Sequence, residues 1–297
     1  MRTFMLIDPA DAPLEKITDR LYIKRDDLLD PLIGGNKFRK LKYNILHAKD
    51  QKKNTLLTFG GAYSNHILAT AKAGALENMN TIGIIRGAAE HGLSPVLTKA
   101  QALGMSLQFI SREDYKLRHN ADYLTALQNA HPNAHIIPEG GTNALALCGV
   151  SEIRTELPDD IDFIATACGS GGTLAGLITA YADREDIEIC GFSILKGEDQ
   201  LTSTVTALLK TNGITPRCTW HINTAHHFGG YAKAPSELVE YIKSFKEQHG
   251  IDLDYVYTGK MMHGITNLLQ NRTDIQKAVA IHTGGLYTAH IRHLETA

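Results

Sequence analysis

The stretch DFIATACGSGGTLAG, residues 162–176, joins an apolar strand pattern to a glycine-rich loop and the start of a helix. Glycines let consecutive backbone N–H groups turn toward one point, and the first turn of a helix adds partial positive charge. Ser170 and Thr173 place two hydroxyl groups in the same loop. The stretch therefore predicts a buried parallel strand followed by a phosphate-binding loop. A plain glycine turn with Thr173 as the helix cap is the alternative.

The rest of the chain repeats this alternation of short apolar runs with longer helical patterns. Several runs are apolar on both alternating faces, which is typical of parallel strands buried between helices. Strands are predicted at 21–25, 55–60, 81–87, 106–111, 134–141, 162–169, 187–194 and 278–285. Helices are predicted at 36–49, 65–78, 94–103, 120–130, 143–156, 172–183, 198–211, 235–249 and 261–270. The pattern predicts an α/β fold with mostly parallel sheets flanked by helices. Because no Pro- or Ser-rich linker divides the chain, two domains would be interleaved.

Composition excludes several classes of protein. The 297 residues are 43% hydrophobic and 21% charged, with a net charge of −2 and no basic block, so we expect no nucleic-acid partner. No apolar run has the length of a membrane span, and residues 1–16 lack the apolar core of a signal peptide. The four cysteines form no CxxC pair and are expected to be reduced thiols. These features predict a cytoplasmic protein that is not bound to a membrane.

Four predicted strands end in glycine-rich segments. They are FGGAYSNH (59–66), PEGGTN (138–143), ACGSGGTLAG (167–176) and HTGG (282–285), and the pair Gly34-Gly35 opens a predicted helix. Ligands of open parallel sheets bind at the carboxyl ends of the strands. One such turn needs no function, but this set predicts a shared binding site.

Other uses of these residues match the sequence less well. Gly169, Gly171 and a displaced Gly176 only approximate a dinucleotide fingerprint, and no acidic residue ends the next strand, so a nucleotide-dependent oxidoreductase is disfavoured. Lys37 follows Gly34-Gly35 but precedes Phe38, which excludes a Walker loop. The 14 histidines include no HExxH, and we expect no metal site.

The segments together resemble a known family. IKRDD (23–27), GGNKFRKL (34–41), GGAYSNH (60–66), PEGGTNALAL (138–147), GSGGTLAG (169–176) and VYTGKMMHG (256–264) occur in the order found in the 1-aminocyclopropane-1-carboxylate (ACC) deaminase/D-cysteine desulfhydrase family. This family belongs to the fold-type II enzymes that depend on pyridoxal 5'-phosphate (PLP). The resemblance implies two interleaved domains of the tryptophan synthase β-like type, with a large PLP-binding domain from 1–44 and 155–297 and a small domain from 45–154.

The resemblance also implies a set of site residues. Lys37 would carry the cofactor as a Schiff base, which requires a lysine whose pKa is lowered by burial or nearby cations. Residues implied to be catalytic are Lys37, Ser64, Tyr231 and Tyr257. Residues implied to bind the cofactor are Asn36, Lys37, Lys40, Asn65, Gly169, Ser170, Gly171, Gly172, Thr173, Thr258, Thr283 and Gly284. Ser64, Asn65 and His66 would bind the substrate, although helix capping by Ser64 or Asn65 is the plain reading.

Thr258 bears on the reaction. ACC deaminases resemble one another in having Glu at this position, whereas D-cysteine desulfhydrases have Thr. The resemblance therefore favours β-elimination from a small D-amino acid, giving pyruvate, ammonia and hydrogen sulfide. ACC deamination to 2-oxobutanoate and ammonia remains the alternative, and a non-catalytic PLP-binding protein is a third. Either Thr258 or Thr283 could contact the pyridine nitrogen, and a homodimer is expected.

Overall fold

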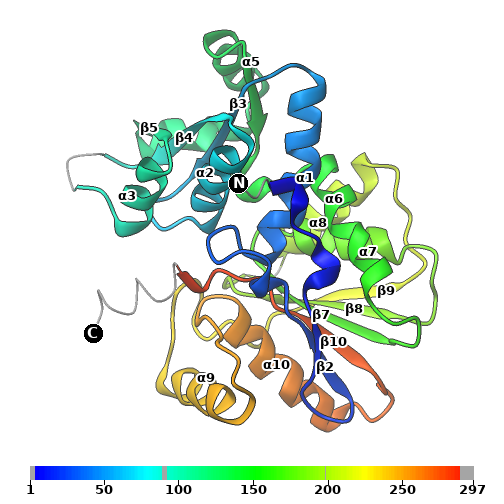
Figure 1. Cartoon of the computed structure of the whole chain (residues 1–297). Helices are drawn as coiled ribbons and strands as arrows, with labels where there is room; N and C mark the ends of the chain where they lie inside the picture. The colour runs from blue at the N-terminus through cyan, green and yellow to red at the C-terminus, as the bar shows by residue number, and fades with distance from the viewer. Residues whose placement is uncertain (1–3, 89–91, 198, 288–297) are drawn as a thin grey trace.

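The computed structural model describes residues 4–88, 92–197 and 199–287, and its strands and helices alternate along the chain (Figure 1). The strands are β1 Leu14–Lys16, β2 Leu21–Lys24, β3 Thr55–Gly60, β4 Asn80–Arg86, β5 Met105–Ile110, β6 Ala134–Ile137, β7 Phe163–Cys168, β8 Glu188–Ser193, β9 Thr219–Asn223 and β10 Ala278–Ile281. The α-helices are α1 Gly35–Asp50, α2 Asn65–Glu77, α3 Pro95–Ala102, α4 Arg112–Lys116, α5 Ala121–Ala130, α6 Ala144–Ser151, α7 Gly172–Ala180, α8 Asp199–Thr211, α9 Ser236–His249 and α10 Thr258–Asn271. Short 3-10 helices are Phe4–Leu6, Pro9–Asp11, Asp26–Leu28, Leu117–His119, Glu139–Gly141 and Glu152–Glu156.

Two open sheets organise the chain. The larger has the strand order β1-β2-β10-β7-β8-β9, and the smaller has the order β5-β4-β3-β6. Among the described residues, β1 and β2 form the one antiparallel pair, and the other strand pairs are parallel. The chain belongs to the α/β class, as the sequence predicts.

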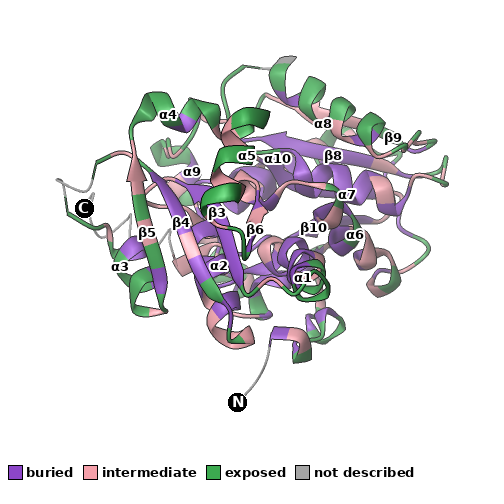
Figure 2. Ribbon diagram, turned by 90° about the horizontal axis from the view of Figure 1, so that it is seen from above, coloured by how far each residue is buried: buried purple, intermediate pink, exposed green. Residues whose placement is uncertain are grey.

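Helices cover both faces of the larger sheet. Phe163 and Ala165 of β7 pack in one core with residues of α9 and α10, whereas Ile164 and Cys168 pack in another with residues of α6, α7 and α8. This alternation buries both faces of β7, and Figure 2 shows the same burial along β8. Apolar residues on both faces are what parallel strands between two helix layers require.

The smaller sheet follows the same rule. Ile85 of β4 packs with residues of α2 and α3, whereas its neighbour Ile84 packs with Tyr115 and residues of α5. Most residues of α5 are exposed, as Figure 2 shows.

Close helix packing joins α1 to the larger sheet. A Cβ atom added to Gly149 of α6 would lie 1.9 Å from the carbonyl oxygen of Arg39 in α1. A Cβ atom at Gly176 of α7 would lie 2.5 Å from Cβ of Val150 in α6. The two glycines therefore let α1, α6 and α7 stack with their backbones near one another. This stacking fixes the start of α1 relative to the loop before α7.

All eight predicted strands are present, with differences at their ends. The predicted strands 134–141 and 278–285 stop early because Gly140, Gly141, Gly284 and Gly285 turn the chain with positive φ. The edge strands β1 and β9 were not predicted, since one is only three residues long and the other is partly exposed along its length. The five-residue helix α4 was also not predicted.

The predicted helices are present with smaller changes. The stretch 143–156 divides into α6 and a 3-10 helix, and α10 begins at Thr258 rather than 261. Residue 198, the predicted start of one helix, lies outside the described residues. Within the described chain, no helix combines the length and apolar character needed to cross a bilayer.

The two sheets draw on the segments that the predicted domains would separate. Strands of the larger sheet come from 14–24 and 163–281, and those of the smaller sheet come from 55–137. Helix α6 lies within the predicted small domain, yet its Leu147 and Val150 pack in the core of the larger sheet. The exact domain limits stay a prediction.

Candidate active site

A cavity of about 1720 Å³ lies where the carboxyl ends of strands from both sheets meet the start of α1. The loops after β3, β7 and β10 line it, as do the segment after β6 and the residues before α10. The shared site predicted from the glycine-rich strand ends is therefore a single cavity in the structure.

Most of the predicted site residues line this cavity. They are Asn36, Lys37, Lys40, Ser64, Asn65, His66, Gly169, Ser170, Gly171, Thr173, Tyr231, Tyr257, Thr283 and Gly284. Gly172 and Thr258 are not among the lining residues. The role of each residue toward a ligand stays a prediction, and the geometry below limits what each can do.

Lys37 occupies the first turn of α1. The glycines before it allow this turn to approach the segment 282–285, because a Cβ atom at Gly34 would lie 3.1 Å from the backbone nitrogen of Gly285. A Cβ atom at Gly35 would lie 2.3 Å from Cβ of Asp26. The Lys37 ammonium donates to Oδ1 of Asn36 at 3.1 Å, and burial lowers its pKa to about 8. A lysine of this pKa is partly neutral near pH 7 and can act as a nucleophile.

Lys40 lies one turn further along α1 and is 1% exposed. Its ammonium donates to the carbonyl oxygen of Gly140 at 3.2 Å and to Oγ1 of Thr142 at 3.3 Å. Burial, and then the charge of Lys37, hold its pKa well below the ordinary value. No carboxylate of the described chain forms an ion pair with Lys40. An anion in the cavity would therefore stabilise both lysines in their charged forms.

The loop before α7 is suited to an anion. Gly171 is the N-cap residue of α7 with φ of +79°, and no side chain caps this helix. Oγ of Ser170 forms a hydrogen bond with Oγ1 of Thr142 at 2.9 Å, which brings the loop close to Lys40. At Gly172 a Cβ atom would lie 2.9 Å from Nζ of Lys40, so this glycine is needed for the close approach. Sequence analysis missed Thr142, although it follows a glycine pair at a strand end.

The loop after β3 carries Ser64, Asn65 and His66. Oγ of Ser64 accepts from the backbone nitrogen of Ile67 at 3.3 Å, so the plain capping role is present. Nε2 of His66 forms a hydrogen bond with Oγ1 of Thr58, which donates to a backbone carbonyl, so His66 donates from Nε2 and carries its lone pair on Nδ1. Burial and then the two lysines hold the pKa of His66 well below its usual value.

The tyrosines form another wall of the cavity. The rings of Tyr231 and Tyr257 meet edge to face, with centroids 6.3 Å apart and planes at 78°. Tyr257 is held by Asp254, whose Oδ1 accepts from its backbone nitrogen at 2.7 Å. Sequence analysis missed Asp254, although an acidic residue just before a helix is a known capping signal.

Thr258 is buried in this cap instead of facing the cavity. Its hydroxyl donates to Oδ2 of Asp254 at 2.7 Å and accepts from the backbone nitrogen of Asp254 at 2.9 Å. Thr283, in contrast, lines the cavity beside Gly284. Of the two threonines that could meet a pyridine nitrogen, the geometry favours Thr283.

The model of the pyridoxal-phosphate dependent enzyme family matches residues 9–284. The chain belongs to this family. A bifunctional D-cysteine desulfhydrase/1-aminocyclopropane-1-carboxylate deaminase of Arabidopsis thaliana mitochondria is 33% identical over 290 residues, covering 90% of this chain and 72% of the relative. A D-cysteine desulfhydrase of Serratia proteamaculans is 28% identical and covers 92% of this chain and 91% of its own.

Solved structures agree with the family. The crystal structure of an ACC deaminase homologue superimposes with a TM-score of 0.82 at 28% identity, covering 96% of this chain and 92% of that one. An O-acetylserine dependent cystathionine β-synthase of Helicobacter pylori has a TM-score of 0.66 at 17% identity, which shows the fold alone. The chain is therefore a PLP-dependent lyase or deaminase with the fold-type II architecture.

The chemistry of the cavity fits PLP. The buried Lys40 and the half-buried Lys37, neither with a carboxylate partner in the described chain, suit a doubly charged phosphate and an aldehyde in one ligand. The uncapped helix start at Gly171 suits the phosphate, because free N–H groups and the helix dipole both favour an anion.

Proposed function

We propose that this enzyme is a D-cysteine desulfhydrase-like lyase that converts a small β-substituted D-amino acid to a keto acid. For D-cysteine and water, the products would be pyruvate, ammonia and hydrogen sulfide. One observation carries the choice of reaction: of the described residues that line the cavity, only Glu139 bears a carboxylate. That carboxylate accepts from the hydroxyl of Tyr115 at 2.7 Å and from Nε of Arg118 at 2.6 Å, so it is already engaged.

The absence of a free acid near the cofactor would affect how well PLP stabilises negative charge on Cα. Bound PLP delocalises the electron pair left on Cα when a proton is removed. An acid at the pyridine nitrogen would keep that nitrogen protonated and strengthen this effect, whereas a neutral hydroxyl such as that of Thr283 would do so much less. Opening the ring of ACC, which has no β leaving group, depends more strongly on this effect than expulsion of a thiolate does. The lack of a free carboxylate among the described lining residues therefore favours β-elimination.

The chain's own groups have the following roles in the proposal. Lys37 would hold the cofactor through its aldehyde, and the Lys37 amine would take the proton from Cα of the substrate. Loss of that proton would allow the Cβ–S bond to break with its electron pair on sulfur. Ser64 and the start of α2 would bind the substrate carboxylate, while Lys40 and residues 169–173 would hold the phosphate. Asn65 would bond the ring hydroxyl, and Tyr231 and Tyr257 would contact the β substituent.

Keto-acid release from D-cysteine and from ACC under matched conditions tests the proposal. We expect pyruvate from D-cysteine and little or no 2-oxobutanoate from ACC. Faster turnover of ACC would overturn the choice of reaction. Borohydride reduction of the yellow holoenzyme should fix the label on Lys37, and a label on another lysine would overturn the site assignment.

A second candidate is deamination of ACC to 2-oxobutanoate and ammonia. It is supported by the Arabidopsis relative, whose name carries both activities. The same paired assay separates the two. A cytoplasmic location and a homodimer stay predictions, and light scattering of the purified holoenzyme tests the second.

A further inference from the structure

The loop from His226 to Ala232 has an unusual backbone and carries Tyr231 to the cavity. Within it, φ is +51° at Phe228, +86° at Gly229, +112° at Gly230 and +57° at Ala232. Positive φ is uncommon for residues with a side chain, and it persists only where the surroundings hold it in place. Tyr231 lies between two of these positions and is 45% exposed, so its own burial does not fix the loop.

Hydrogen bonds within the loop, such as that from the backbone nitrogen of Gly229 to Nδ1 of His227 at 2.9 Å, shape it locally, and Lys260 ties it to α10. This lysine lies in the first turn of α10, is 0% exposed, and donates from Nζ to the carbonyl oxygen of His227 at 2.8 Å and of Gly230 at 2.7 Å. These carbonyls bracket Phe228 and Gly229 and directly precede Tyr231. His263, one turn further along α10, meets the ring of Phe228 edge to face with centroids 4.9 Å apart. One face of α10 thus holds the loop at its backbone and at a side chain.

The same helix start also carries Tyr257, the ring partner of Tyr231. Asp254 fixes Tyr257 through its backbone nitrogen, and Lys260 follows three residues later. The start of α10 therefore positions both tyrosines, although Tyr231 is distant from this helix in sequence. Rigid support of this kind is what a substrate-contacting side chain on a loop requires.

A buried ammonium is costly at this position. Burial lowers the pKa of Lys260 to about 8, with the charge of Asp254 opposing that shift, and no carboxylate of the described chain forms an ion pair with it. An apolar side chain of the same length would fill the space without this cost. An apolar side chain could not, however, form the two hydrogen bonds to the carbonyl oxygens of His227 and Gly230.

We infer that Lys260 is a positioning residue that holds the loop 227–231 so that Tyr231 covers the substrate side of the cavity. The role of Tyr231 toward a substrate rests on the proposed function, whereas the anchoring of the loop does not. The experiment therefore has one arm that needs no activity and one that does.

The first arm measures the opening of the loop by limited proteolysis of the holoenzyme. Lys233 is exposed just after the loop, and trypsin cleaves on its carboxyl side. Lys260→Met should speed this cleavage, measured by mass spectrometry, by roughly tenfold or more relative to the unmodified enzyme. Lys260→Arg, which keeps donors at this place, should restore most of the protection. Lys243→Met, which removes an exposed lysine of α9, is the matched control and should leave the rate unchanged.

The second arm is a double-mutant cycle on keto-acid release. Lys260→Met and Tyr231→Ala should each lower kcat/KM by roughly 10- to 100-fold while the PLP absorbance and the melting temperature stay near those of the unmodified enzyme. The double variant should lose no more than Tyr231→Ala alone, because Lys260 acts through Tyr231.

The outcomes separate the two proposals. If the unmodified enzyme releases no keto acid from D-cysteine, the proposed function fails, and the proteolysis arm still decides the anchoring. Unchanged cleavage after Lys233 in Lys260→Met would overturn the inference. Additive losses in the cycle would overturn the link to Tyr231. If Lys260→Met does not fold, Lys260→Gln, whose shorter side chain keeps a donor but cannot reach both carbonyls, takes its place in both arms: cleavage after Lys233 in Lys260→Gln at the unmodified rate overturns the inference.

Discussion

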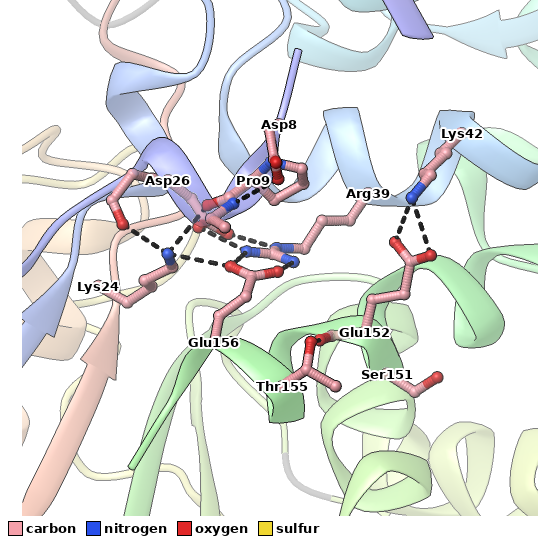
Figure 3. A network of polar contacts seen from close by, with 12 residues as sticks. Asp8, Pro9, Lys24, Asp26, Arg39, Lys42, Ser151, Glu152, Thr155 and Glu156 are labelled. Atoms are coloured by element: carbon pink, nitrogen blue, oxygen red, sulfur yellow. Dashed lines mark hydrogen bonds and ion pairs between the residues drawn. The ribbon is translucent and has the colours of Figure 1, made fainter. Parts of the chain in front are cut away.

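Helix α1 carries cationic side chains on two of its sides. Those on one side form ion pairs with carboxylates, and those on the other do not. On one side Arg39 is 1% exposed and lies among carboxylates (Figure 3). On the other, Lys37 and Lys40 face the cavity without a carboxylate partner in the described chain. The positions are only one or two residues apart, so the neighbourhood and not the helix decides the difference.

The Arg39 side is fully compensated. Nε of Arg39 lies 2.6 Å from Oδ2 of Asp26, and its NH1 lies 2.7 Å from Oε1 of Glu156. Glu156 also pairs with Lys24 at 2.9 Å, and Lys24 donates to the carbonyl oxygen of Pro9 at 3.0 Å (Figure 3). Burial alone would lower the pKa of Arg39, but Asp26 and Glu156 more than offset it and raise the pKa. This network joins the N-terminal segment and β2 to α1 and to the 3-10 helix Glu152–Glu156.

On the cavity side, the charges of Lys37 and Lys40 have no carboxylate partner in the described chain. A buried charge whose partner is absent from the chain either neutralises or receives its partner from a ligand. We therefore interpret the Arg39 cluster as structural and propose the lysine pair as a binding site for an anion. Four experiments test this distinction, taken from the largest expected effect to the smallest.

Arg39→Met should produce the largest loss of stability. It leaves Asp26, which is 0% exposed, without its counter-ion, and removal of one member of a buried pair costs about 3–5 kcal/mol. Urea unfolding of the apoprotein measures it. The control is Lys42→Met, at another position of α1. It breaks a partly exposed ion pair with Glu152 and should cost about 1 kcal/mol or less. Equal losses in the two variants would contradict the structural role of the Arg39 cluster.

Lys40→Met should change stability in the other direction. Removing a buried lysine that lacks a counter-ion should stabilise the apoprotein by roughly 1–3 kcal/mol, because the folded state no longer has to deprotonate or bury that charge. The same change should weaken PLP binding by roughly 10- to 100-fold, since the phosphate loses a cation. Unfolding of the apoprotein and a PLP titration followed by absorbance give both numbers. A destabilised apoprotein with unchanged PLP affinity would place Lys40 in the structural class.

The pH dependence of cofactor attachment tests Lys37. Only the neutral amine reacts, and with a pKa of about 8 its neutral fraction rises roughly tenfold between pH 7 and pH 9 and then levels off. An ordinary lysine, with a pKa near 10.5, would continue to gain about tenfold per pH unit through pH 9. Stopped-flow absorbance of the apoprotein with PLP measures the profile, and Nα-acetyl-lysine, which keeps a free side-chain amine, serves as the reference. A profile that matches the reference amine would show that burial does not activate Lys37.

Ser170→Ala should have the smallest effect. It removes a hydroxyl that would bond the phosphate, worth about 0.5–1.5 kcal/mol or up to roughly tenfold in PLP affinity, whereas the exposed hydrogen bond of Ser170 to Thr142 contributes little to the apoprotein. Stability of the apoprotein should barely change. Thr204→Ala, at an exposed position of α8 that also lines the cavity, is the control and should leave PLP affinity unaltered. No loss of affinity in Ser170→Ala would remove its hydroxyl from the phosphate site.

Local patterns account for the parts that were predicted correctly. Apolar runs of strand length define β7 and β8, and the glycines after the strands define the turns, because both depend on residues adjacent in sequence. The role of Lys37 came from the family resemblance of the GGNK segment and stays a prediction, although the structure places this lysine at the cavity. The edge strand β9 was missed because half-exposed edges carry a weaker apolar signal than buried strands.

The α/β class, the glycine-rich loops and the resemblance that pointed to Lys37 follow from the order of residues, since each depends on consecutive positions. Which charges are compensated depends instead on contacts between distant segments. Arg39 meets Glu156 across 117 positions, and Lys40 meets Thr142 across 102, so neither contact follows from local spacing. The same holds for Thr258 and Thr283: both are threonines near glycine, but the cap formed by Asp254 turns the first inward and leaves the second to the cavity. Charge, burial and solvent access depend on what the fold brings together, and that is why the chemistry of these side chains could be read only in three dimensions.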